Sequence, residues 1–520
     1  MNILFVLYGD FSSNSANYLE VFARELDQSG HSCAMAVPTR LETISQNEDP
    51  TFRPIVYDNV LADPVAIFPD GRAADVIHAC TPREVVRRFI TSYMVKRPTP
   101  LVIYLEDNEG WISTRTLGLD ERTLVQHTEK EISDRLPDAL AHPFYYESFV
   151  GLADAVAVIQ DKLRIMVPPW VQCETVMPGV DLNFFSPRSP DFSLRAKYSI
   201  AKNDKVIVYH GGMNIFTRPG IETVCRAVGI INQQGYPCRL LRTGPFALDF
   251  LGQLPDEASS VVSDLGFLPK QELPGLLALA DVFVQPGKID PFEDLRLPSK
   301  VPEFLAMERP VIMPNANVAH LFRDGWDAIL LSTGTAEEIA EKCIGLFSHP
   351  YRASEIGRAG RVLAQKYFDV KSQARRLQDL YEIARENFDP AIASATWSDT
   401  DHIAPVRLVL ARRLRAMADS RGRLSRIDAG EMLREHARYI EFTQQRLTGL
   451  EADIVNRRNE TKKLSGLLAE RDREITELQQ ILSEIQSSIS WRTSSPIRFA
   501  GRALRKIKKD LLRRRKLKKL

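Results

Sequence analysis

Short apolar runs alternate with longer amphipathic stretches from residue 1 to about residue 390. Short apolar runs bounded by turn residues are typical of buried strands, whereas 17–29 and 221–234 carry apolar residues at helical spacing. Alternating strands and helices predict parallel sheets with helices on both faces. The predicted strands form two series, one at 3–8, 32–37, 76–79, 101–105 and 155–159, the other at 205–209, 239–242, 282–285, 311–313 and 329–331.

Two consecutive series of this kind predict an α/β protein with two Rossmann-like, doubly wound domains. We expect the first domain at 1–185 and the second at 190–370, because a stretch with Pro178 and Gly179 separates the two series. Residues 371–388 have helical composition, and we expect this helix to pack back on the body.

The pattern changes after residue 388. Residues 389–405 hold proline, serine, threonine and aspartate without a clear period and are predicted to be a linker, followed by a helical connector at 406–435. A heptad repeat occupies 436–490, and between Ile440 and Ile489 seven of eight a positions and four of seven d positions are apolar. This repeat predicts a long α-helical coiled coil and therefore a homo-oligomer, although arginine at d positions 457 and 471 weakens the packing.

The charges divide unevenly between the body and the end of the chain. The 520 residues include 68 Lys and Arg against 67 Asp and Glu, a net charge of +1. Eleven of the last 19 residues are basic and one is acidic, which gives +10 there and leaves −9 on the other 501. Leu504, Ile507 and Leu511 share a helical face among these cations, so 491–520 is predicted to be a basic amphipathic tail.

We expect residues 497–520 to bind an anionic membrane surface, where each Lys or Arg contributes about 1 kcal/mol. A solvated or protein-binding tail is the alternative. Nucleic-acid binding is disfavoured because no recognised nucleic-acid module accompanies the tail.

The remaining composition favours a cytoplasmic protein, peripheral on the inner face of the cell membrane. No run of about 18 apolar residues, the length that spans a bilayer, occurs. The apolar run at 3–8 ends at Gly9 and lacks a basic segment before it, so a first strand is favoured over a signal peptide. Six scattered cysteines without a CxxC pair fit a reducing compartment.

Several catalytic motifs are absent from the sequence. No GxGxxG follows the first strand, no GxxxxGK[ST] occurs and no HExxH occurs, which disfavours dehydrogenases, P-loop NTPases and HExxH zinc enzymes. Asp399, Thr400 and Asp401 form a DxD triplet within the predicted linker, which we interpret as a chance match. We therefore expect no metal and no cofactor.

Candidate chemistry gathers in the second series of strands. Gly211 and Gly212 follow the strand at 205–209, and Arg218 opens the next helix. A glycine pair lets the backbone approach a ligand, and a helix N-terminus favours phosphate. Lys300 and Glu303 lie one helical turn apart, which suits a cation for a diphosphate and a carboxylate for ribose hydroxyls.

Further motifs follow in order: LGFLPKQEL at 265–273, ADVFVQP at 280–286 and PSKVPEFLAMERPVI at 298–312. Together with the Gly-Gly motif and VMPGVDLNFFSP at 176–187, they resemble the retaining GT-B glycosyltransferases of family 4, over roughly residues 1–388. The resemblance implies metal-independent transfer of a sugar from a nucleotide-diphospho-sugar with retention. It also implies a donor site in the second domain and an acceptor site in the first.

The resemblance assigns roles to individual residues. Glu303 resembles the second, ribose-binding member of the family's glutamate pair, whereas the first member would fall at Leu295. Asp290, Glu293 and Asp294 are the acidic candidates to take its place. Glu308 replaces the glycine expected before Arg309 and Pro310.

The expected phosphate-binding cations match only in part. Arg218 stands where the family has a lysine, and Gly212 stands where a second basic residue is usual, so Arg242 or Lys300 is the candidate for the second contact. Gly266, Phe267 and Leu268 resemble the loop whose backbone contacts the base. The implied catalytic residues are Arg218, Lys300 and Glu303, and the implied donor-binding residues are Gly211, Gly212, Arg242, Gly266, Phe267, Leu268, Asp290 and Glu293.

Structural interpretations stand beside these roles. Glu303 could be a charge that stabilises a helix N-terminus, Lys300 a solvated side chain and Arg218 an ion-pair partner. His78 and His127 are more often structural than catalytic. The loop at 12–17 is either part of the acceptor site or an ordinary polar turn.

The expected partners are a nucleotide-sugar donor and a growing glycan or lipid-linked acceptor. A non-catalytic scaffold on a coiled coil is the main alternative, supported by Leu295 and Gly212 at the two unmatched positions. A nucleotide-sugar epimerase on the same fold is a further alternative, but it would explain the basic tail poorly.

Overall fold

The structure is a computed structural model that describes residues 1–46, 50–124, 126–213, 217–244, 259–287 and 289–398. It also describes seven helical residues between 471 and 480. The chain divides into two compact units, Met1–Ala416 and Met417–Leu520. Apart from those seven residues, the predicted connector, coiled coil and tail lie outside the described residues, and the fold below is that of the first unit.

The first sheet has seven parallel strands in the order β3-β2-β1-β4-β5-β6-β7. Its central strands are buried on both faces, as parallel sheets covered by helices require. Their bounds are β1 Asn2–Val6, β2 Ser32–Val37, β3 Arg53–Val56, β4 Val76–Cys80, β5 Leu101–Leu105, β6 Ala155–Val158 and β7 Cys173–Thr175.

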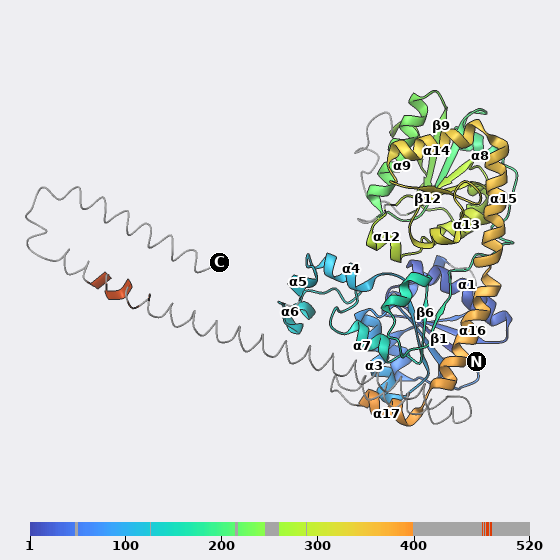
Figure 1. Ribbon diagram of the computed structural model, residues 1–520. Helices are drawn as coiled ribbons and strands as arrows, with labels where there is room; N and C mark the ends of the chain where they lie inside the picture. The colour runs from blue at the N-terminus through green and yellow to red at the C-terminus, as the bar shows by residue number, and fades with distance from the viewer. Residues whose placement is uncertain are drawn as a thin grey trace, which may run out of the picture. The chain divides into compact units, whose positions relative to one another are not determined.

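Helices cover both faces of this sheet (Figure 1). Helix α1 begins where the Ser13 hydroxyl accepts a hydrogen bond from the amide of Ala16, and its apolar face packs toward the sheet. The helices of the first domain are α1 Asn14–Gln28, α2 Tyr57–Ala62, α3 Glu84–Lys96, α4 Glu109–Thr116, α5 Glu121–Leu124, α6 Glu129–Ser133 and α7 Tyr146–Gly151.

The second sheet has six parallel strands in the order β10-β9-β8-β11-β12-β13. Its strands are β8 Lys205–His210, β9 Cys238–Thr243, β10 Val262–Asp264, β11 Val282–Val284, β12 Val311–Pro314 and β13 Ile329–Leu331. Its helices are α8 Phe192–Lys197, α9 Arg218–Gln233, α11 Leu273–Leu277, α12 Pro291–Leu295, α13 Lys300–Ala306, α14 Ala336–Ser348 and α15 Pro350–Tyr367. The predicted pair of Rossmann-like α/β domains is thus confirmed.

Helix α16 (Val370–Asn387) returns to the first domain, where it packs against α1 and β6. A short parallel bridge pairs Val180 with Asp369 at this crossing, and a Cβ on Gly179 would lie 2.6 Å from Val370 Cα. The Tyr381 hydroxyl lies 2.8 Å from Nδ1 of His78, which is fully buried. Because burial lowers the pKa of His78 to about 3, this histidine stays neutral and has a structural role.

One boundary in the sequence prediction is wrong. Residues 390–398, expected within the linker at 389–405, form helix α17 (Pro390–Ser398), which packs against α3. Pro390 begins the helix, as is common at a first turn, and the Asp389 carboxylate accepts a hydrogen bond from the amide of Ala391. The Trp397 ring packs edge-on against Phe149, so an apolar contact holds the helix on the body.

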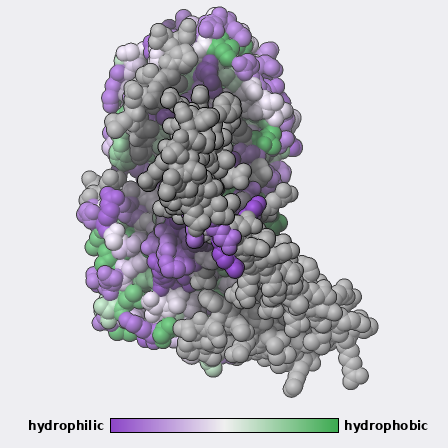
Figure 2. All heavy atoms as spheres, turned by 90° about the vertical axis from the view of Figure 1, so that its left-hand side faces the viewer, coloured by the Kyte–Doolittle hydropathy of each residue, from purple (hydrophilic) through white to green (hydrophobic). Residues whose placement is uncertain are grey.

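The large apolar side chains on the described surface are scattered over different elements. Large exposed apolar residues such as Ile165, Phe192 and Tyr351 belong to different helices. On the face in Figure 2, the hydrophobic residues among the coloured atoms occur in small groups between hydrophilic ones. Among the described residues, no helix has both the length and the apolar character that crossing a bilayer demands.

Candidate active site

The topology of the second sheet marks one place for a ligand. Strand β8 pairs with β9 on one side and with β11 on the other, so the connections leave in opposite directions at the junction of β8 and β11. Ligands of open α/β sheets bind at the carboxyl ends of the strands at such a switch point. Gly211 follows β8 and Gln285 follows β11, which places both at this edge.

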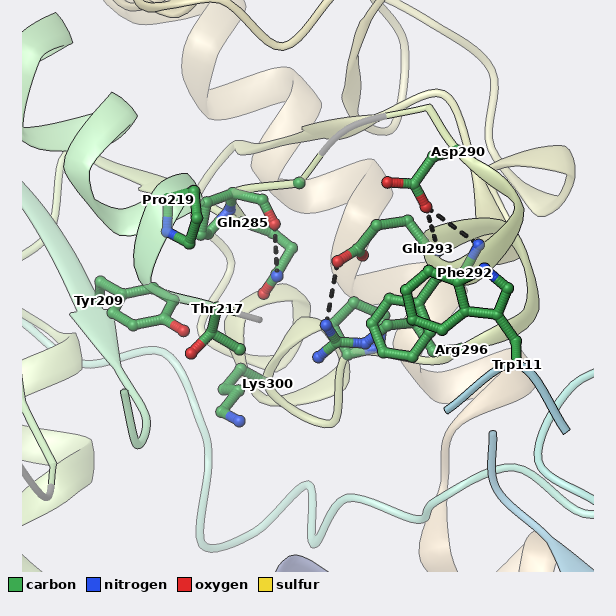
Figure 3. Close-up of a pocket in the computed structure, with 14 residues that line it drawn as sticks. Trp111, Tyr209, Thr217, Pro219, Gln285, Asp290, Phe292, Glu293, Arg296 and Lys300 are labelled. Carbon is green, nitrogen blue, oxygen red and sulfur yellow. Dashed lines mark hydrogen bonds and ion pairs between the residues drawn. The ribbon is translucent and has the colours of Figure 1, made fainter. Parts of the chain in front are cut away.

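A cavity of about 240 Å³ opens there (Figure 3). Polar and charged side chains of Gln285, Glu293, Arg296 and Lys300 line it, together with Asp290 at the start of α12. Tyr209 and the N-terminal residues of α9 complete one wall, and Trp111 and Phe292 complete another. Charged groups, aromatic rings and a helix N-terminus thus face one small volume.

Lys300 lies against the glycine that follows β8. A Cβ on Gly211 would come within 2.7 Å of Lys300 Cε, and Gly211 has a φ of +149°, so only glycine fits there without strain. Burial and the neighbouring Arg296 guanidinium lower the pKa of Lys300 to about 8. No described residue forms an ion pair with its ammonium group, which leaves that group available to an anion in the cavity.

Glu303, one turn further along α13, does not line the cavity. Its Oε2 lies 2.5 Å from Nε2 of His210, the last residue of β8, and the His210 ring packs edge-on against Phe304. Glu303 therefore lies beside the Gly211 turn, next to the cavity.

Arg242 is not at the cavity surface, which contradicts its predicted role as a phosphate contact. It is fully buried and forms an ion pair with Asp264, and it donates a 3.3 Å hydrogen bond to the carbonyl of Gly211. A charge buried this deeply needs such a partner. Arg242 consequently supports the turn that follows β8 and does not face a ligand.

Arg218 is also placed differently from the prediction. It is the first residue of α9, but its guanidinium pairs with Glu222 at 2.8 Å, and it does not line the cavity as its neighbours Thr217, Pro219 and Gly220 do. The i,i+4 spacing of arginine and glutamate favours this pairing on a helix surface. The α9 N-terminus thus faces the cavity mainly through its backbone. A Cβ on Gly220 would lie 3.0 Å from Pro286, so the helix can approach this wall closely only with glycine there.

The predicted base-binding loop lies outside the cavity. The carbonyl of Gly266 accepts hydrogen bonds from the amide of Gly244 and the hydroxyl of Thr243, and Gly266 has a φ of +64°. Phe267 is 63% exposed and Leu268 packs partly against the core. Gly212, likewise, does not line the cavity.

Helix α12 supplies the acidic wall. The Asp290 carboxylate accepts hydrogen bonds from the amides of Phe292 and Glu293, which fixes the start of the helix. Glu293 is 8% exposed and pairs with Arg296 at 3.0 Å, and burial raises the pKa of Glu293. Leu295 points into the core, so Glu293 is the carboxylate of this helix that faces the cavity beside Asp290.

The first domain contributes to the same wall. The Trp111 ring stacks on Phe292 with 4.7 Å between ring centroids. The Gln160 side chain donates hydrogen bonds to the carbonyls of Asp294 and Arg296, and Lys162 forms an ion pair with the Asp294 carboxylate. Gln160 and Lys162, in the segment that follows β6, thus hold α12 in position.

Ionisable residues also gather at the carboxyl edge of the first sheet. The Arg83 guanidinium pairs with Glu109 at 3.1 Å and lies 3.8 Å from the centroid of the Tyr8 ring. Glu106 accepts hydrogen bonds from the hydroxyls of Ser15 and Tyr18. Burial raises the pKa of Glu106 and of Glu109 to about 7, against the opposing effect of these partners.

The other candidates have structural roles. Ser13, in the loop at 12–17, caps α1, and Nδ1 of His127 contacts the carbonyl of Thr123 within one helical turn. Across the described part of the chain, no three His, Cys, Asp or Glu side chains are grouped as a metal site would require.

Lys300, Asp290 and Glu293 are the predicted site residues that the structure brings together in the cavity. The sequence analysis missed Trp111, Gln285, Phe292 and Arg296. Gln285 carried a usable signal, because it is a polar residue directly after a buried strand at the switch point. Trp111 carried none, since it reaches the cavity only through the packing of the first domain on α12.

Comparisons with known proteins agree with this architecture. Residues 204–349, which contain the whole second sheet, match the sequence model of the family described as "Glycosyl transferases group 1". The comparison with curated proteins finds no match for the chain.

Solved structures with the same fold include HepE of Anabaena in complex with UDP and glucose, at 16% identity and a TM-score of 0.54, covering 73% of this chain and 98% of that one. Sucrose-phosphate synthase of Thermosynechococcus elongatus has 15% identity and a TM-score of 0.53, covering 74% and 98%. WaaG, a glycosyltransferase involved in lipopolysaccharide biosynthesis, has 14% identity and a TM-score of 0.53, covering 73% and 99%. The likeness shows that the two α/β domains have the GT-B fold.

Proposed function

We propose that this chain is a glycosyltransferase that moves a sugar from a nucleotide-diphospho-sugar to an acceptor. One observation carries the proposal: the family match at 204–349 contains every residue that lines the switch-point cavity except Trp111, and that cavity has a lysine available to an anion at its β8 side. HepE, which shares the fold, has been solved with UDP and with UDP-glucose.

The diphosphate of the donor would lie between Lys300 and the N-terminus of α9. Both are positive, since a helix N-terminus carries unpaired amides and the positive end of the helix dipole. In the transfer step the bond between the anomeric carbon of the sugar and the diphosphate breaks, and a bond forms between that carbon and the oxygen of an acceptor hydroxyl. The hydroxyl proton passes to the leaving diphosphate, whose developing negative charge these groups stabilise. Arg242 supports this arrangement indirectly, through the carbonyl of Gly211.

The Glu303 carboxylate would accept hydrogen bonds from the hydroxyls of the donor ribose, with His210 as the neighbour that orients the carboxylate. The turn at Gly266 would contact the base through its backbone. Transfer with retention and without a metal is part of the proposal and rests on the family resemblance of the motifs.

The acceptor would bind at the carboxyl edge of the first sheet, near Tyr8 and Arg83. We propose a growing glycan, lipid-linked and at the cytoplasmic face of the membrane, because the predicted basic tail would hold the enzyme there and because WaaG acts in lipopolysaccharide biosynthesis. The predicted coiled coil would make the enzyme a homo-oligomer.

A non-catalytic scaffold remains the second candidate, and Leu295 at the first glutamate position favours it. The two candidates differ in ligand binding and turnover. An enzyme binds a nucleotide sugar and loses activity when Lys300 is neutralised, whereas a scaffold does neither.

The test is a thermal-shift panel on the full chain with UDP, GDP, ADP and their sugar conjugates, followed by hydrolysis or transfer assays with the donor that binds. A ligand at 100 times its Kd stabilises the folded state by about 2.7 kcal/mol, which is readily measured. Lys300→Ala should abolish the shift, and Lys342→Ala, which changes a partly exposed lysine of α14 away from the cavity, should not. If none of the nucleotides raises Tm, the transferase proposal is wrong.

A further inference from the structure

Two buried oxygen atoms in the wall of the cavity have no hydrogen-bond partner among the described residues: Oε1 of Gln285 and Oε2 of Glu293. Gln285 is 4% exposed and Glu293 8% exposed, and both line the cavity. A buried acceptor left unpaired costs about 1–3 kcal/mol, so unpaired acceptors beside a cavity indicate that a ligand completes them.

Neighbouring groups fix the direction of both oxygens. The Gln285 amide nitrogen donates a 2.9 Å hydrogen bond to the carbonyl of Pro286, which can only accept, so the amide oxygen must point elsewhere. Oε1 of Glu293 accepts from Arg296 at 3.0 Å, and Oε2 lies against Gly287, where a Cβ would come within 3.2 Å. The two side chains lie side by side in Figure 3, between Lys300 and Tyr209 on one side and Phe292 and Trp111 on the other.

The charged groups near Glu293 are Arg296, Asp290 and Asp107. The pKa of Glu293 is raised first by burial and further by Asp290 and Asp107, and Arg296, which opposes this, is already paired with Glu293. Lys300 lies instead against Gly211 at the β8 side of the cavity. One end of the cavity therefore suits a diphosphate, and the other offers acceptors to groups that donate hydrogen bonds.

We infer that Gln285 and Glu293 bind hydroxyl groups of the donor's sugar ring and select a neutral or amino sugar over a uronic acid. This inference rests on the proposed function and names the sugar class of that site. Hydroxyl and amino groups donate to the two oxygens, whereas the carboxylate of a uronic acid has no proton to donate and meets like charge. The 240 Å³ volume lies below the roughly 300–1,000 Å³ of sites for drug-sized ligands, so beside the diphosphate it has room for no more than a single sugar ring.

The test compares the binding of a free nucleotide with that of its sugar conjugates by calorimetry on the full chain. For UDP the conjugates are UDP-glucose, UDP-galactose, UDP-N-acetylglucosamine and UDP-glucuronic acid; if the panel selects GDP, they are GDP-mannose and GDP-mannuronic acid. At least one neutral conjugate should bind more tightly than the free nucleotide, and the uronic acid conjugate should bind at least tenfold more weakly than that conjugate.

Two substitutions test the residues. Glu293→Gln should weaken the preferred conjugate about tenfold, as expected for loss of a charged acceptor, and should reduce the discrimination against the uronic acid. Gln285→Met, of similar volume, should weaken the conjugate by a smaller factor. Both should bind the free nucleotide within twofold of wild type, and Glu341→Gln, at an exposed position of α14, is the matched control.

The outcomes separate the two proposals. If no free nucleotide binds, the proposed function fails and this inference fails with it. If the nucleotide binds but the uronic acid conjugate binds as tightly as the neutral ones, or Glu293→Gln leaves the sugar preference unchanged, the sugar-class inference alone is wrong.

Discussion

At the scale of single residues, Lys300 shows how backbone geometry sets side-chain chemistry. The turn after β8 needs glycine at position 211, and the space that the missing Cβ leaves is filled by the Lys300 side chain. This position shields the ammonium group partly from water and places it near Arg296, and both effects lower its pKa to about 8. The lysine is therefore a cation whose charge changes within an accessible pH range.

This shift predicts a pH dependence of nucleotide binding. The fraction of Lys300 that carries charge falls as pH rises through about 8, so the Kd for the diphosphate should increase by up to about tenfold between pH 7 and pH 9. Lys300→Arg keeps its charge over this range, and its Kd should change little. Calorimetry at four pH values measures both profiles. Identical profiles for wild type and Lys300→Arg would show that Lys300 does not bind the diphosphate.

At the scale of elements, α15 packs so closely on α13 that it requires glycine. A Cβ on Gly357 would lie 2.5 Å from the carbonyl oxygen of Glu308, directly after α13. Glu308 itself has a φ of +60°, the left-handed conformation in which glycine is favoured after a helix. The absence of a side chain at Gly357 thus leaves room for the backbone of the left-handed turn at Glu308.

Gly357→Ala should therefore destabilise the protein by about 1–3 kcal/mol, because the added methyl overpacks against backbone that cannot rotate away. Gly345→Ala in α14 is the matched control: a Cβ there meets nothing within 4 Å, and alanine should stabilise the helix by about 0.5–1 kcal/mol. Thermal unfolding should show Tm lowered in the first variant and raised in the second. A shift of the same sign in both would refute the packing argument.

The elements also show where sequence reasoning ends. The central strands, such as β1 and β5, were predicted because a strand buried on both faces is a continuous apolar run. The missed strands β3, β7 and β10 are all at sheet edges, and their residues are partly exposed. An edge strand with one solvated side has no apolar run to detect, so its pairing is visible only in three dimensions.

The candidate site divides in the same way. Lys300, Asp290 and Glu293 lie in one continuous segment after β11. Lys300 was predicted from its spacing to Glu303, and Asp290 and Glu293 were predicted from the family resemblance of this segment. Arg242 was misplaced because sequence does not reveal that Asp264, on the neighbouring strand β10, holds it in the interior. Trp111 was missed because its place in the cavity depends on the contact between two domains.

At the scale of the whole molecule, charge separates along the chain into −9 over residues 1–501 and +10 over residues 502–520. An anionic membrane would attract the basic residues 502–520 and repel the negatively charged remainder. The basic residues would then tether the enzyme to the membrane, while the active site would stay away from the lipid surface. A homo-oligomer would present several tails at once, and linked weak contacts bind far more tightly than single ones.

Deleting residues 502–520 should therefore abolish sedimentation of the full chain with vesicles that contain phosphatidylserine, while nucleotide binding stays unchanged. Wild type should not sediment with vesicles of phosphatidylcholine alone, and raising the salt concentration should weaken its binding, because the attraction is screened over about 8–10 Å. Replacing Leu504, Ile507 and Leu511 with glutamine keeps the charge and removes the predicted apolar face. If the glutamine variant binds the vesicles as well as wild type, the tail acts by charge alone and is not an amphipathic anchor. If the chain without residues 502–520 still binds, the tail does not tether the enzyme to the membrane.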